Sequence, residues 1–400
     1  MWQAEIRVDL DAIRHNVARL CAAAGAGAGA GSSHPGGKPG AEVMAVVKGD
    51  GYGHGMLPVA RAALEAGATW LGGCTLPEAM ALRAAGIQAP ILAWLLAPGL
   101  PLQDAVDAGV DLSAATLELL DEVVTAAKAA GRAARVHLKL DTGLNRGGAT
   151  AAEWPALLEA AARARDGGAL EVVGVWSHLA RADEQDLDAS SSIDTQLAMF
   201  RSGLARARQF GIIPPYRHLA NSAATLTRPD AHFDLVRPGI AVYGLSPVAG
   251  RDFGLRPAMT VRGRVVIAKR VPAGSGVSYG HTYTTQRPAT LAVVPLGYAD
   301  GLPRAASNRG PVRLAGATRT IAGRVCMDQI VLDCGDDEVR PGDVATLFGP
   351  GDAGEPTADD WAEAAGTINY EIVTRMSTVR VPRVYDGAAA GDASLPGQAG

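Results

Sequence analysis

The sequence EVMAVVKGDGYGHG, residues 42–55, joins an apolar run to a glycine-rich segment. Its apolar run at 43–47 has the composition of a buried strand, and Lys48 follows that run directly. A lysine held in an apolar site has a lowered pKa and can form a Schiff base with a carbonyl compound. The glycines after it permit close approach of a ligand to the backbone, and Tyr52 and His54 offer polar contacts. A lone lysine at a strand end is usually a solvated surface group, so the neighbouring segments have to support this interpretation.

On both sides of this stretch, short apolar runs alternate with longer segments of helical period. The runs occupy residues 42–48, 69–74, 89–95, 110–114, 135–140, 172–179, 216–222 and 234–245. Eight strand–helix units over about 250 residues are what a (β/α)₈ TIM barrel requires. We therefore predict an α/β fold with a barrel at 11–245, preceded by a strand within residues 1–10 that associates with a second domain.

The pattern changes after about residue 255, where helical segments nearly vanish and Gly, Pro and Asp turns separate alternating apolar residues. This predicts a C-terminal mainly-β domain, which we assign to 246–386. Within it, TADDWAEAAG at 357–366 opens with a Thr-x-x-Asp helix-capping signal. The closing run NYEIVTRMSTVRVPRVYD, residues 369–386, is predicted to be a last strand.

Two segments have too few apolar residues to offset the entropy of ordering them. They are the Gly/Ala-rich insertion at about 22–40, predicted to be flexible, and the tail at 387–400, predicted to be disordered.

Composition excludes several classes of partner. The formal net charge of −4 gives no long-range attraction to nucleic acid or to an anionic membrane, so neither partner is expected. The longest apolar stretch, about Ile91 to Leu100, contains Pro98 and is too short for a membrane span. The N-terminus lacks the pattern of a signal peptide. We expect a cytoplasmic protein.

The cysteines show neither disulfide nor metal-site spacing. Cys21, Cys74, Cys326 and Cys334 are scattered without a CxxC motif, and a chain of this length does not need disulfide cross-links. We expect reduced thiols and no metal site.

Polar residues cluster where the predicted strands end, which is where active sites of such barrels lie. They are Lys139, Asp141 and Arg146 in LKLDTGLNRGG, His178 in VWSHLARAD, Asn221 and Ser222 in HLANSAATL, and Arg237 and Gly239 in LVRPGIAVYGL. Each alone could be a structural polar residue, but their joint occurrence at strand ends favours a functional site.

Motifs along nearly the whole chain resemble those of alanine racemases, which are pyridoxal-phosphate enzymes of fold type III. The motifs are RVDLDAIRHNV, AVVKGDGYGHG, LKLDTGLNRGG, HLANSAATL, VRPGIAVYGL, VSYGHTY, PLGYADG, GRVCMDQIVLD and INYEI with VRVPRVY. One departure is Gly49-Asp50-Gly51, where the family more often has Ala-Asn-Ala.

The resemblance implies interconversion of L- and D-alanine by a two-base mechanism, which supplies D-alanine for peptidoglycan synthesis. Lys48 would hold pyridoxal 5'-phosphate and act as the base on one face of the substrate. Tyr279 would be the base on the other face, reaching the site from the β domain of a partner in a homodimer with shared active sites.

The resemblance also implies roles for further residues. His178 and Arg237 would form a network with Tyr279, with Arg237 at the pyridine nitrogen, where a residue that keeps its proton weakens the ring as an electron sink. Cofactor binding, mainly at the phosphate, is expected from Tyr52, Asn221, Ser222, Gly239, Ile240 and Tyr370. Substrate contacts are expected from Arg146 and Met327, with Lys139, Asp328 and Tyr298 in support and Lys139 carbamylated in many family members.

Three alternatives remain at this stage. An amino-acid decarboxylase of the same architecture would need a larger pocket and an acidic partner for the pyridine nitrogen, where this chain offers Arg237. A non-enzymatic cofactor carrier on the same barrel would lack the β domain. A racemase of broader specificity, acting on serine or larger amino acids, is the main alternative, because one sequence does not reveal the size of the substrate pocket.

Overall fold

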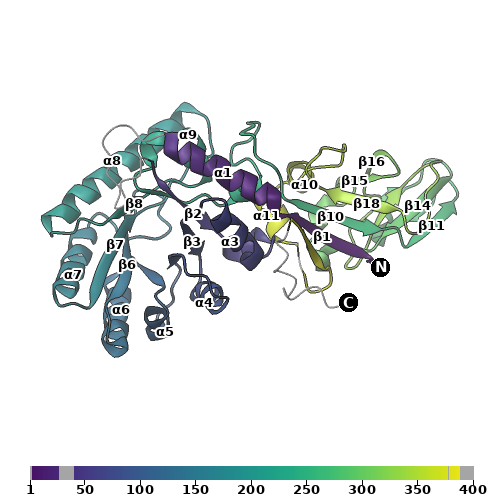
Figure 1. The fold of residues 1–400 in the computed structure, drawn as a ribbon. Coiled ribbons are helices and arrows are strands. Elements are labelled where there is room, and N and C mark those ends of the chain that lie inside the picture. The colour runs from purple at the N-terminus through teal and green to yellow at the C-terminus, as the bar shows by residue number, and fades with distance from the viewer. Residues whose placement is uncertain (1, 27–39, 377, 388–400) are drawn as a thin grey trace.

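The computed structural model describes residues 2–26, 40–376 and 378–387 of the chain. Figure 1 shows a strand-and-helix barrel at one end of the molecule and a β-rich unit at the other. Strand β1 (Ala4–Asp9) belongs to the β-rich unit, and helix α1 (Leu10–Ala26) leads from it onto the barrel. In the described part of the chain, no helix is long and apolar enough to cross a membrane.

Eight parallel strands form the barrel. They are β2 (Glu42–Val46), β3 (Trp70–Gly73), β4 (Ile91–Ala93), β5 (Asp111–Ala114), β6 (Ala134–Lys139), β7 (Leu170–Trp176), β8 (Tyr216–His218) and β9 (Leu235–Val236). Their order is β8-β7-β6-β5-β4-β3-β2-β9. Backbone bonds from Asp234 N to Arg217 O (3.0 Å) and from Arg237 N to Ala220 O (2.9 Å) close the ring. The predicted fold class, a TIM barrel followed by a β domain, is confirmed.

Helices connect these strands; the longer ones cover the outside of the barrel (Figure 1), and the short α2 lies at the barrel mouth. They are α2 (Lys48–Tyr52), α3 (Met56–Glu65), α4 (Leu76–Ala84), α5 (Leu102–Asp107), α6 (Leu117–Ala130), α7 (Trp154–Asp166), α8 (Leu187–Gln209) and α9 (Ser222–Thr227). Helix α6 illustrates the sequence rule. It buries Leu120, Val123 and Ala127 at helical spacing, and the Thr116 hydroxyl caps its start by accepting from the backbone N–H of Leu119.

Among the described residues, the β-rich unit contains three sheets. Its further strands are β10 (Met259–Arg264), β11 (Ile267–Val271), β12 (Gly276–Val277), β13 (Tyr283–Thr284), β14 (Ala289–Val294), β15 (Pro311–Leu314), β16 (Ala317–Thr320), β17 (Ile330–Asp333), β18 (Val344–Phe348) and β19 (Arg383–Asp386). The sheet orders are β16-β15-β18-β10-β1-β19, β11-β14-β17 and β12-β13. The capping signal predicted at 357–366 is present, since Thr357 and Asp360 form a capping box at the start of α10 (Ala358–Ala365).

The run at 369–386 was predicted as one strand, and this is wrong for its first part. Residues Asn369–Thr374 form helix α11, and only β19 is a strand, paired in parallel with β1. Ile372 and Val373 are β-branched and have high strand propensity, but both are buried in helix α11. Tertiary packing outweighs strand propensity here.

The prediction of a flexible insertion at about 22–40 is wrong for its first residues. Residues 22–26 continue α1 as helix, because Ala-rich sequence favours helix and Ala24 is buried against the core. Residues 27–39 and 388–400, which make up most of the predicted insertion and of the predicted disordered tail, lie outside the described residues.

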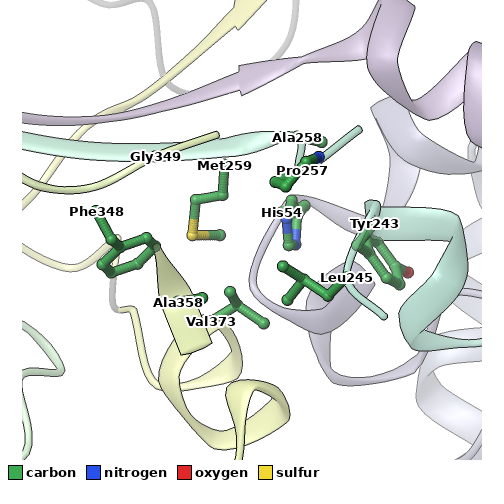
Figure 2. Close-up of a pocket in the computed structure, with 10 residues that line it drawn as sticks. All are labelled: His54, Tyr243, Leu245, Pro257, Ala258, Met259, Phe348, Gly349, Ala358 and Val373. Carbon is green, nitrogen blue, oxygen red and sulfur yellow. The ribbon is translucent and has the colours of Figure 1, made fainter. Parts of the chain in front are cut away.

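A small cavity marks the junction between the barrel and the β-rich unit (Figure 2). His54 and Tyr243 border it from the barrel side, and Met259 and Phe348 from the β-rich side. The His54 ring is fully buried, its Nδ1 lies 2.9 Å from the Tyr52 carbonyl oxygen, and burial lowers its pKa to about 4. His54 is therefore a neutral packing residue at this junction.

Candidate active site

Lys48 lies at the carboxyl end of β2, where it begins α2 at the mouth of the barrel. Its side chain is half-buried, and Nζ lies 5.8 Å from the centroid of the Trp94 ring. Trp94 follows β4 by one residue, so two neighbouring strand ends supply the amine and an aromatic wall beside it. The predicted position of the amine at the strand ends is the one observed.

The backbone behind Lys48 forms a left-handed turn. Residues Gly49, Asp50, Gly51 and Tyr52 have φ angles of 61°, 52°, 62° and 51°. Glycine adopts this conformation readily, whereas each of the other two residues costs roughly 1–2 kcal/mol. The two glycines that depart from the common family pattern are therefore suited to this turn.

Side-chain and backbone groups from three other elements, α4, α3 and β19, hold the turn. The Gly49 N–H donates to Glu78 Oε1 at 2.7 Å, and Glu78 also belongs to the capping box of α4. Asp50 accepts from the Met56 N–H at 2.9 Å through Oδ1 and from Arg383 Nη2 at 2.8 Å through Oδ2. Because Arg383 lies in β19, the β-rich unit helps to fix the segment that carries Lys48.

Hydroxyls and backbone N–H groups converge beside this turn. Ser222, at the start of α9, accepts from the Gly239 N–H at 2.8 Å and from the Ala241 N–H at 3.3 Å. The Tyr52 ring lies 6.3 Å from that of Tyr370 in α11, and burial raises the pKa of both phenols. Both therefore stay protonated and can donate. A Cβ atom at Gly239 would lie 2.3 Å from the Tyr52 hydroxyl, so glycine is required there.

Asn221 and Ile240 belong to the same corner of the barrel. The Asn221 side chain caps α9 by accepting from the Ala224 N–H at 3.0 Å. Ile240 begins the short helix η2 (Ile240–Tyr243), directly after Gly239.

A second group of strand ends supplies cationic residues. Arg237 is almost fully buried after β9, and its Nη2 lies 3.3 Å from His178 Nδ1. Burial, followed by the charges of Arg237, Arg146 and Lys139, lowers the pKa of His178 well below its usual value. Burial and the charges of Arg237 and Arg146 lower the pKa of Lys139 to about 8. The Lys139 Nζ lies 4.5 Å and the Arg237 Cζ 4.8 Å from the centroid of the Trp176 ring. This end of the barrel is therefore suited to an anionic ligand.

Apart from Tyr370, the site residues predicted in the β-rich unit form a separate exposed group. Tyr279 is 72% exposed, Met327 51% and Tyr298 39%. Backbone bonds tie two of their loops together, from Tyr298 N to Cys326 O and from Ala299 N to Met327 O, both 3.0 Å. The Asp328 carboxylate pairs with Arg380 at 2.5 Å.

The backbone beside Tyr279 is unusual. Ser278 has a φ of 60°, Gly280 of 71° and His281 of 44°. The Ser278 hydroxyl donates to the Arg324 carbonyl oxygen at 2.8 Å, which anchors the strained segment. Strain of this kind persists only where the surroundings enforce it, and it is common at functional sites.

One set of polar residues in the barrel interior escaped the sequence analysis. His218 contacts Arg237, His137 contacts His218, and Asp111 contacts His137, so these side chains connect Arg237 to the far end of the barrel. The available signal was a histidine inside each of two otherwise strand-like runs, at 135–140 and 216–218. Such positions in a barrel usually carry branched apolar residues.

Comparisons with known proteins agree with this architecture. The family described as alanine racemase, N-terminal domain, matches residues 8–247, and the alanine racemase C-terminal domain matches residues 258–385. An alanine racemase of Salinispora arenicola is 67% identical over 387 residues, covering 97% of this chain and 99% of the relative. One of Thermobifida fusca is 59% identical over 386 residues, covering 96% and 98%.

Solved structures give the same result. Alanine racemase from Streptomyces lavendulae has a TM-score of 0.91 at 51% identity, covering 97% of this chain and 98% of that one. The Streptomyces coelicolor enzyme has a TM-score of 0.90 at 53% identity, covering 96% and 98%. Both domains and nearly the full length are matched, and the chain therefore belongs to the alanine racemase family.

Proposed function

We propose that the chain interconverts L- and D-alanine with pyridoxal 5'-phosphate as cofactor. The observation that supports this most directly is the convergence of Lys48, the hydroxyl and N–H cluster around Gly239, and Arg237 at one end of one barrel. These residues supply an amine for a carbonyl, donors for a phosphate and a cation for an aromatic ring nitrogen.

The residues present fit this cofactor. Donors surround Gly239, and the Cβ that any other residue would add there would collide with Tyr52. Tyr52, Ser222, Tyr370 and the backbone at Gly239 and Ile240 would hold the phosphate, with Asn221 fixing the start of α9. When bound, pyridoxal phosphate supplies an electron sink that makes the α-hydrogen of an attached amino acid acidic.

Racemisation needs two proton-transfer groups, because a single base returns the proton to the face from which it came. We assign Lys48 to one face. We assign the other to Tyr279 of a second copy of the chain, since within one chain Tyr279 is 72% exposed on the β-rich unit. Met327, Asp328 and Tyr298 would enter with it. A homodimer with shared sites is thus part of the proposal.

The barrel mouth would orient the substrate. Arg146 lies close enough to lower the pKa of both Lys139 and His178, and it would bind the substrate carboxylate. Lys139, beside Arg146, would orient it, and in a carbamylated form would do so as an anion. His178 accepts from Arg237, so it is neutral and can take part in the network that reaches Tyr279.

The cellular setting belongs to the same proposal. All four cysteines are unpaired in the structure, as expected in a reducing compartment such as the cytoplasm. The D-alanine formed there would serve peptidoglycan synthesis.

The direct test measures racemisation by the purified protein with added pyridoxal phosphate. Initial rates with L-alanine and D-alanine should be high in both directions, and rates with serine and lysine define the substrate range. A protein that takes up the cofactor but leaves both alanine enantiomers unchanged would contradict the proposal.

A further inference from the structure

A line of buried polar side chains crosses the interior of the barrel. It begins at Arg237, after β9, and continues through His218 in β8 and His137 in β6 to Asp111, the first residue of β5. The contacts are 3.0 Å from Arg237 Nη1 to His218 Nδ1, 2.8 Å from His218 Nε2 to His137 Nδ1, and 3.1 Å from His137 Nε2 to Asp111 Oδ2. Both histidines are fully buried and Asp111 is 1% exposed.

Because Arg237 can only donate hydrogen bonds, it determines which ring nitrogen of each histidine carries the proton. Arginine can only donate, so His218 Nδ1 is an acceptor and the His218 proton is on Nε2. His137 Nδ1 must accept that proton, which places the His137 proton on Nε2, facing the Asp111 carboxylate. Every N–H therefore points from Arg237 toward Asp111.

The far end of the line is an anion with a counter-ion. Arg135 binds Asp111 at 2.7 Å through Nε and at 3.1 Å through Nη2. Although burial opposes ionisation of Asp111, its bonds to His137 and Arg135 keep its pKa below the usual value. Asp111 can therefore act as the fixed acceptor at the end of the line.

Arg237 itself has no carboxylate among the hydrogen-bond partners that the described residues provide. Its Nη2 donates to the carbonyl oxygens of Ser177 at 2.7 Å and Leu219 at 3.3 Å, and the two histidine contacts complete the set. A fully buried guanidinium without an adjacent anion is costly, and burial lowers its pKa to about 9. The polarised histidine pair provides an indirect link to the Asp111 charge.

Neighbouring residues pack closely against the two histidines of this line. A Cβ atom at Gly174 would lie 2.1 Å from His137 Nδ1, so the histidine ring occupies the space that a side chain on β7 would need. The His218 ring stacks on Trp176 at 5.6 Å between centroids, with an interplanar angle of 4°. Trp176 Nε1 donates in turn to Ser113 Oγ at 2.9 Å. The rings of His137 and His218 are therefore held in place by their packing.

We propose that Asp111, His137 and His218 form a positioning relay that holds Arg237 as an oriented cationic donor and thereby sets the electronic state of the cofactor ring that Arg237 faces. None of the three touches the reacting atoms. Their effect on the ring rests on the proposed function, because it requires pyridoxal phosphate with its ring nitrogen at Arg237.

The first test is ¹⁵N NMR of the histidine side chains in the full-length protein without cofactor. Ring nitrogens with and without a proton have widely separated chemical shifts. We expect His137 and His218 both to be neutral with the proton on Nε2. A proton on Nδ1 of either ring, or a doubly protonated ring, would overturn the relay.

The second test compares two variants that each remove one negative charge beside Arg135. Asp111→Asn introduces a donor at the end of the relay. Glu171→Gln alters the other carboxylate on Arg135, 3.3 Å away, which lies outside the relay. The readouts are the ¹⁵N shift of the ring nitrogen in labelled, bound pyridoxal phosphate, the kinetic constants for alanine, and thermal unfolding.

We expect Asp111→Asn to shift the ring-nitrogen signal and lower kcat by roughly 2- to 30-fold with less change in KM, and Glu171→Gln to do neither. Equal responses of the two variants would refute the relay. If Asp111→Asn does not fold, His137→Leu, which cuts the line in the middle, replaces it. A wild-type protein that binds no cofactor would refute the proposed function, while the histidine tautomers would still decide whether the relay exists.

Discussion

The barrel mouth and the exposed face of the β-rich unit contain the two halves of one proposed site, and they are built differently. In the barrel mouth, buried and half-buried side chains from several strand ends of one chain lie close together. On the β-rich face, Tyr279, Met327 and Tyr298 are 72%, 51% and 39% exposed and lie on a strained but well-anchored backbone. The first group is organised within one chain, whereas the second is open to solvent, and we propose that it acts on a second copy of the chain.

Loss of Lys48 should have the largest effect, because this amine is assigned both cofactor attachment and proton transfer. Lys48→Ala should lower racemisation by about 10⁴-fold or more. In the wild-type protein, borohydride reduction followed by peptide mapping should place the cofactor on Lys48. Lys269→Ala is the control, since it removes a lysine from the β-rich unit and should leave activity intact. A reduced adduct on Lys139 or Lys269 would contradict the assignment.

Loss of Tyr279 should act on only one face of the substrate. In Tyr279→Phe, racemisation should fall by about 10²–10⁴-fold in both directions, because equilibrium requires the two rates to fall together. Lys48 can still remove and return the α-hydrogen of D-alanine. Exchange with deuterated solvent, followed by NMR, should persist for D-alanine and be much weaker for L-alanine.

Tyr283 offers a matched control, because its hydroxyl donates to Asp333 Oδ2 at 2.7 Å and is already used within the β-rich unit. Tyr283→Phe should keep both exchange reactions. Equal exchange of both enantiomers in Tyr279→Phe would show that another group, such as Tyr283 or a bound water, is the second base.

Sharing of sites between two copies can be tested by mixing inactive subunits. Lys48→Ala and Tyr279→Phe proteins should each be nearly inactive, but a heterodimer has one intact site. Random exchange of equal amounts should restore roughly one quarter of the wild-type sites, measured as D-alanine formed. A mixture with the double variant Lys48→Ala/Tyr279→Phe in place of either partner should stay inactive. Heterodimers that form without recovering activity would show that each chain builds its own site.

The smallest effect concerns Lys139 and the pH dependence of stability. Its pKa is about 8 in the folded chain against an ordinary value of 10.5, so between these pH values the unfolded chain binds the extra proton. Stability therefore rises with pH in this window, and the Lys139→Met variant should lack that contribution. The measurement is thermal unfolding from pH 7.5 to 10.5 in carbon-dioxide-free buffer. If the stability of the wild-type protein and that of Lys139→Met depend on pH in the same way, Lys139 does not titrate as a free amine, as expected of a carbamate.

Much of the barrel mouth follows from local sequence. Period and composition predict eight strands, and Lys48, Lys139, His178, Ser222 and Arg237 were predicted to lie at strand ends, where the structure has them. The roles assigned to them came from the family resemblance and stay predictions. The strand predicted at 369–374 failed because β-branched residues also pack on a buried helix face.

What the sequence determined by itself is the order of strands and helices and the side chains placed at the strand ends, because both depend on periodicities within a few residues. Only the tertiary structure revealed the support behind them. Arg383 donates to Asp50, 333 residues away in the sequence, and His137 contacts His218, 81 residues away. These bonds exist because the barrel closes and the β-rich unit packs against it, and a hydrogen bond between side chains depends on distance in space, which local sequence patterns do not encode.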